Sequence, residues 1–144
     1  MKRTVYFFVL FAVFASGVLG HLLLRPTPPS EKFYTVTLKT DAVCALLLSS
    51  LPEAGEVLSL SGCRATLLSC EKEPHILYFR REGKLLSRPS TLSVCLSFTL
   101  RVAAHEQNDR LFLGTRGVSI GEKMPLSGQN FVISALFLGY EPSF

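Results

Sequence analysis

The sequence predicts a mainly β protein with one short helix, in which an N-terminal transmembrane helix is followed by a small β-barrel. Three observations favour this fold class. An apolar segment near the N-terminus is as long as a bilayer is thick, alternating apolar and polar residues mark several strands, and one glycine-centred motif occurs twice. The 144 residues are enough for one domain at most.

The first predicted element is a transmembrane anchor over residues 5–24. This apolar run would span roughly 30 Å as a helix, which is the thickness of the hydrocarbon core of a bilayer. A cleaved signal peptide is the alternative, with Val13-Phe14-Ala15 as its cleavage site. Cleavage there would leave the apolar sequence GVLGHLLL near a new N-terminus, so we expect the segment to remain as an uncleaved anchor.

The flanks of the anchor predict how the chain is oriented. Lys2 and Arg3 make the N-terminal flank the more positive one, which places residues 1–4 in the cytoplasm and residues 33–144 outside the membrane. Residues 25–32 contain RPTPPS and are predicted to be a short, stiff spacer. The net charge of +4 is concentrated before residue 33, so the outer domain lacks the basic face that a nucleic-acid partner requires.

The outer domain begins with a pattern typical of a half-buried strand over residues 33–39. Asp41 resembles a helix N-cap, and Pro52 would end the short helix that follows over residues 42–51. Further strands are predicted at 63–71, 92–103 and 130–140, with a hairpin over 75–89 whose turn lies at 81–84.

The motif GExxxLSG begins at Gly55 and again at Gly121, and in each case a predicted strand precedes and follows it. We interpret this as a duplication with halves at about 33–73 and 92–140, which would pair around a pseudo-two-fold axis into a closed β-barrel. Glycine tolerates positive φ, so the four motif glycines are predicted to be structural turn residues. They are Gly55, Gly62, Gly121 and Gly128.

The chain resembles an uncharacterised bacterial family of single-pass membrane proteins, known only as a domain of unknown function and common in Gram-positive, clostridia-like organisms. The resemblance depends on the N-terminal span, on FYTVTLK, on EAGEVL and on VSIGEKMPLSGQNFVISALFLGY. It implies an outward-facing β domain and provides no catalytic residues. The cysteine content and the short HEQND turn depart from the family pattern.

Residues able to carry chemistry are few, so we expect no catalytic, cofactor-binding or metal site and no small-molecule substrate. The four cysteines lack metal-ligand spacing and are interpreted as core residues or as one disulfide pair. His75 and His105 are assigned to polar turns, without a nucleophile in a recognisable context. The cysteines are Cys44, Cys63, Cys70 and Cys95.

The basic cluster formed by Arg80-Arg81 and Lys84 to Arg88 is either a solvated hairpin tip or a contact site for anionic lipid headgroups or wall polymers. The sequence therefore predicts a membrane-anchored, extracytoplasmic, non-enzymatic binding or assembly module of the bacterial cell envelope, with another envelope protein as its partner. The alternatives are a membrane-tethered hydrolase-like enzyme, or a protein that binds wall polymer or lipid headgroups directly.

Overall fold

The computed structural model describes residues 30–44 and 51–144, and this part of the chain is mainly β, as predicted. The predicted anchor at 5–24 lies outside the described residues, within which no helix is long and apolar enough to span a membrane. The strands are β1 (Lys32–Thr40), β2 (Val43–Cys44), β3 (Val57–Leu60), β4 (Cys63–Arg81), β5 (Lys84–Gln107), β6 (Arg110–Leu113), β7 (Arg116–Val118), β8 (Lys123–Ser127) and β9 (Val132–Pro142).

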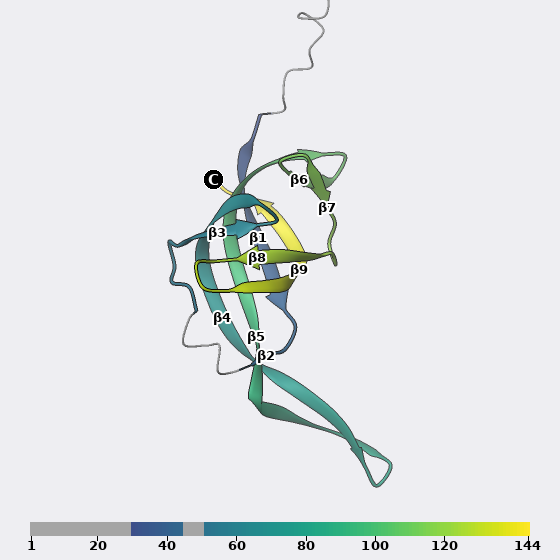
Figure 1. Ribbon diagram of the computed structural model, residues 1–144. Helices are drawn as coiled ribbons and strands as arrows, with labels where there is room; N and C mark the ends of the chain where they lie inside the picture. The colour runs from purple at the N-terminus through teal and green to yellow at the C-terminus, as the bar shows by residue number, and fades with distance from the viewer. Residues whose placement is uncertain (1–29, 45–50) are drawn as a thin grey trace, which may run out of the picture.

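Six of these strands are paired in a ring in which every pairing is antiparallel. The order runs β1, β9, β8, β3, β4 and β5, and β5 then pairs with β1 again. The short strands β6 and β7 lie outside this ring. β6 pairs with the C-terminal end of β5, at His105 to Gln107, and β7 pairs with β6 (Figure 1). Each of the six strands therefore has a hydrogen-bonded neighbour on both sides for at least part of its length, which limits the unpaired edge.

The interior of the ring is filled by alternate side chains of its strands. In β1 the buried apolar residues are Tyr34, Val36 and Leu38, which are the three that the alternation in the sequence predicts, and Thr40 at the end of the strand is buried as well. Phe98 of β5 and Phe137 of β9 are fully buried in the same cluster. Burial of this apolar surface is the main term that stabilises the sheet.

The predicted helix over residues 42–51 is wrong where the structure describes it. Val43 and Cys44 form strand β2 and pair with Val94 and Ser93 of β5. Residues 45–50 lie outside the described part. The pairing with β5 is a tertiary contact, and such contacts override a weak local helix preference.

The two GExxxLSG motifs have the same backbone hydrogen bonds. The N–H of Gly55 donates to the carbonyl of Leu67 and the N–H of Leu67 donates to Glu56, at 2.8 and 2.9 Å. In the second motif the N–H of Gly121 donates to the carbonyl of Phe137 and the N–H of Phe137 donates to the carbonyl of Glu122, again at 2.8 and 2.9 Å. Leu67 in β4 and Phe137 in β9 are therefore equivalent positions.

The remaining strand pairings extend this equivalence from the turns to the whole ring. An irregularity in pairing occurs between Leu67 and Ser69 of β4, and the corresponding one in β9 leaves Leu138 without a register partner. The exposed fractions of the two bulged side chains, Leu68 and Leu138, are 43% and 41%. The strands also correspond in pairs, β1 to β5, β3 to β8 and β4 to β9. When the two members of each pair are exchanged, every strand keeps neighbours that are paired in the ring.

Candidate functional site

The glycines predicted as turn residues have different backbone requirements. Gly55, Gly62 and Gly121 have φ values of +94°, +89° and +88°. Gly128 does not have positive φ, which corrects the expectation for that position, and a side chain there would overlap the ring of Phe131. The reason is that Ser61-Gly62 forms a two-residue turn, whereas β8 and β9 are joined by the longer segment 128–131.

All four cysteines lie in the described part of the chain and are unpaired there. Cys44 is exposed at the end of β2, so its predicted position inside an apolar helix is wrong. Burial raises the pKa of the Cys70 thiol, which keeps it protonated and less reactive at neutral pH. In residues 30–44 and 51–144, no cluster of three or more histidine, cysteine or acidic side chains is placed to hold a metal ion.

The two histidines lie in strands, so their assignment to polar turns is corrected. His75 lies in β4 at a second irregularity in pairing, and its Nδ1 is 2.8 Å from Ser93 Oγ. The Ser93 hydroxyl donates to Ser90 Oγ at 2.9 Å. His105 lies in β5, where its ring stacks on Phe112 at 5.1 Å between centroids.

Serine hydrolases place a serine beside a histidine, but no described acidic group completes such an arrangement at this contact. No described carboxylate is hydrogen-bonded to His75, so the imidazole lacks the third group that orients it in a triad. The nearest acid in the sequence, Glu73, binds Lys39 and Ser97 instead. The contact between His75 and Ser93 joins β4 to β5 at a position where their regular pairing is interrupted.

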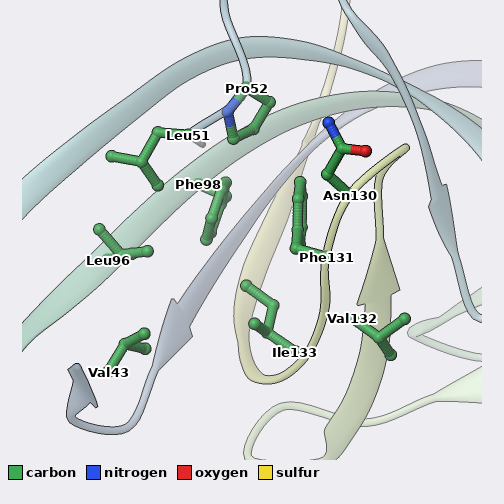
Figure 2. A pocket seen from close by; sticks show the side chains of 9 residues that line it. All are labelled: Val43, Leu51, Pro52, Leu96, Phe98, Asn130, Phe131, Val132 and Ile133. Carbon is green, nitrogen blue, oxygen red and sulfur yellow. The ribbon is translucent and has the colours of Figure 1, made fainter. Parts of the chain in front are cut away.

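The part of the chain that the structure describes contains an apolar pocket of about 250 Å³ beside β5 and β9. Figure 2 shows its lining side chains, among which Asn130 is the only one with a polar group and none is titratable. The pocket can hold a small apolar group, and its described lining supplies no acid, base or nucleophile. The lining residues are Val43, Leu51, Pro52, Leu96, Phe98, Asn130, Phe131, Val132 and Ile133.

The hairpin formed by the end of β4 and the start of β5 is the part of the described chain that extends beyond the ring. Among the described residues, 76–89 pair only with each other, from Ile76↔Pro89 to Arg81↔Lys84, and no other described strand pairs with either outer edge of this ribbon. Figure 1 shows the ribbon extending well away from the other strands. We call residues 76–89 the arm; its hairpin form and its turn at 81–84 were predicted from the sequence.

The arm leaves the sheet at the end opposite to the one where β1 begins. Lys32, the first residue of β1, pairs with Ala104 near the far end of β5, whereas the arm is the beginning of β5. At about 3.3 Å per residue, more than ten residues of β5 separate Ala104 from the base of the arm. The arm therefore points away from the side at which the N-terminal segment enters the domain (Figure 1).

Comparison of the chain with protein-family models, with curated proteins and with solved structures finds no match in any of the three. The resemblance to a bacterial membrane-protein family stays a prediction.

Glu122 is expected to stabilise the fold in a pH-dependent way. Its carboxylate accepts a hydrogen bond from Arg116 and another from the N–H of Ser119, and these bonds hold the pKa of Glu122 below its ordinary value of 4.5. A depressed pKa stabilises the folded state above that ordinary value, and the stabilisation is lost as the pH falls through the lower folded-state pKa. Glu122→Gln should therefore lower the urea midpoint at about pH 7. The difference in midpoint between the variant and the parent chain should shrink well below pH 4.5.

Glu56→Gln is the matched control for this measurement. The Glu56 carboxylate accepts from the N–H of Glu53 at 3.0 Å, as Glu122 does from Ser119, but no arginine in the described residues forms an ion pair with it. Glu56→Gln should therefore lower the urea midpoint less than Glu122→Gln does at about pH 7. A deficit for Glu122→Gln that stays constant from neutral to acid pH would show that the ion pair with Arg116 does not act through the pKa.

Proposed function

We propose that the chain is a membrane-anchored, non-enzymatic binding or assembly module of the bacterial cell envelope, and that the arm is the part that contacts its partner. Residues 5–24 would form the single membrane span, with residues 1–4 in the cytoplasm and the β domain outside. The domain would be a closed β-barrel of two duplicated halves, and its role is to hold the arm away from the membrane.

The ring of strand pairings supports the barrel and its duplication. Two of the pairs that join the halves connect equivalent residues to each other, namely Thr37↔Thr99 between β1 and β5 and Leu60↔Leu126 between β3 and β8. A pseudo-two-fold axis relating the halves would pass through both pairs. A closed sheet also has few unpaired edges, so an unpaired ribbon that extends from it is a specific feature of the molecule.

The observation that carries the binding function is the apolar character of the arm. Its large apolar side chains are exposed by 37% to 70%, and no other described strand pairs with the two-stranded ribbon to which they belong. An isolated two-stranded ribbon is marginally stable in water, and exposed apolar groups in one place mark interaction sites. The six residues are Ile76, Leu77, Tyr78, Phe79, Leu85 and Leu86.

The competing enzyme function is favoured by one observation, the contact between His75 and Ser93. It is less well supported, because the described pocket has no titratable lining residue and His75 has no orienting carboxylate among the described residues. Ser93→Ala separates the two proposals. A binding module should keep its cellular function in this variant, whereas a serine hydrolase should lose it.

Shortening the arm tests the proposed function. Deleting 77–80 together with 85–88 removes four residues from each strand, so the alternation of faces, the turn and the pair Ile76↔Pro89 are kept. A photoreactive amino acid at Tyr78 of the full chain should form a discrete adduct in living cells, and the shortened chain should lose cellular function.

Two controls make the outcome interpretable. Ile120→Ser removes an apolar side chain that is 70% exposed but lies outside the arm, and function should be kept. A photoreactive residue at Val57, which is 51% exposed in β3, should not give the same adduct. A shortened chain that folds, inserts normally and keeps full function would contradict the proposal.

A further inference from the structure

We infer that the partner of the arm is a protein with an acidic groove, which encloses both faces of the ribbon. This inference rests on the proposed function and adds the chemical nature of the partner. Three properties of the arm carry it, namely the sign of its charge, the distribution of its apolar side chains over two faces, and the polarity of its tip.

The charge of the arm is strongly positive for so short a segment. Four basic residues, Arg80, Arg81, Lys84 and Arg88, are accompanied by one acid, Glu82. In the described part of the chain, the only ion pair within the arm is Arg81 to Glu82 at 4.0 Å, and both side chains are more than 70% exposed. An exposed pair at this distance contributes little, so the cations of the arm are available to an acidic partner.

The register shows that three of these cations share one face. Side chains that are directly opposite in an antiparallel pair point to the same side, and successive residues alternate. This rule assigns Arg81, Lys84 and Arg88 to one face, and Arg88 lies over the ring of Phe79 on that face at 5.6 Å. We call it the cationic face; its residues are Leu77, Phe79, Arg81, Lys84, Leu86 and Arg88.

The opposite face carries apolar side chains too, together with Arg80, and this distribution determines the shape of the partner. It includes Ile76, Tyr78 and Leu85, and the last two are 70% and 69% exposed. A flat surface would cover one face and leave the other in water. A groove that encloses the ribbon would bury both faces and exclude water around the cations, where their attraction to carboxylates is strongest.

The tip of the arm makes a lipid bilayer a poor partner. The turn consists of Arg81, Glu82, Gly83 and Lys84, so insertion of the arm tip-first would carry three charged side chains deepest into the membrane. A ribbon lying flat on the membrane would leave the apolar side chains of one of its two faces in water. The arm also leaves the domain at the end opposite to the start of β1, away from the predicted anchor.

Photocrosslinking in cells that express the full chain tests the inference, with the photoreactive residue at Leu86 on the cationic face. The partner in the adduct should be a protein, so digestion should leave a peptide of the partner joined to residue 86, and this peptide should contain or adjoin Asp or Glu residues. Changing Arg81, Lys84 and Arg88 together to Glu should reduce the adduct by at least about tenfold. Replacing the mapped acids of the partner by Lys should restore the adduct with this reversed arm.

The matched control reverses three cations outside the arm, Lys32, Arg64 and Arg110, which are all exposed. It changes the net charge by the same amount and should leave the adduct within about twofold. A peptide around residue 86 that carries a non-peptide group after protease digestion and becomes soluble in organic solvent would identify a lipid, and an adduct with twice the mass of the chain would identify a second copy. Either would overturn the inference, as would an adduct unaffected by charge reversal, whereas absence of any adduct from both Tyr78 and Leu86 would refute the proposed function itself.

Discussion

Replacing Phe137 by alanine should lower the free energy of unfolding by about 3–5 kcal/mol, among the largest losses expected for one substitution in this chain. Phe137 is fully buried in β9 and pairs with Leu38 of β1, where β9 helps to close the ring. Removing its ring would leave a cavity that the surrounding side chains cannot fill, because they belong to strands fixed by hydrogen bonds on both sides.

Leu67→Ala tests the equivalent position, because Leu67 in β4 has the same backbone hydrogen bonds as Phe137 in β9. It is 1% exposed, and its loss should cost about 2–5 kcal/mol. Phe144→Ala is the control for the residue type, since Phe144 is fully exposed at the C-terminus and its loss should change stability by less than about 0.5 kcal/mol.

The measurement is protease resistance of the full chain in detergent across a series of urea concentrations. If Phe137→Ala and Phe144→Ala were equally stable, β9 would not form part of a packed core, and closure of the ring through β9 would be wrong. If Leu67→Ala alone were destabilising, the two halves would not contribute equally to the core.

Much of the β structure could be predicted because the relevant signals are local. Alternation placed β1 correctly, and the turn at 81–84 was identified from polar residues around Gly83. The helix prediction failed over residues 42–44 because a strand of two residues has no pattern of its own. Only its pairing with Val94 and Ser93 of β5 defines it.

The sequence showed less of the repeat than the structure does. GExxxLSG was recognisable because the turn constrains the residue types at Gly55 and Gly121. The flanking strands also correspond, with TVTLK in β1 matching SFTLR in β5 and ATLLSCE in β4 matching ALFLGYE in β9. These matches were missed because the loops between the strands differ in length, so a single spacing does not align all of them.

The arm illustrates a different limit of prediction. Its residues predict a hairpin, and the basic cluster in it predicts either a solvated tip or a contact site for anionic lipid headgroups or wall polymers. Within the part of the chain that the structure describes, residues 76–89 have no neighbouring strand, because β1, β2 and β3 pair with β4 and β5 only before or after the arm. Such an absence is a property of the whole topology and has no local signal.

Substituting valine for Gly55 or for Gly121 should destabilise the chain by a similar amount, about 1–3 kcal/mol in each case. Both residues have φ near +90°, and a Cβ atom at either position would meet no other atom within 4 Å. The cost is therefore backbone strain rather than a steric clash. Because Gly55 and Gly121 also donate equivalent hydrogen bonds, to Leu67 and Phe137, relaxation of the turn would disturb the same contact in each half.

Gly139→Val is the matched control for both variants. Gly139 lies in β9, its φ is not positive, and a Cβ atom there also meets no atom within 4 Å. A branched side chain is compatible with a strand, so this change should alter stability by less than about 0.5 kcal/mol. If only one of the two turn variants were destabilising in the urea series, the motifs would resemble each other without performing the same structural role, and the proposed duplication would lose its main support.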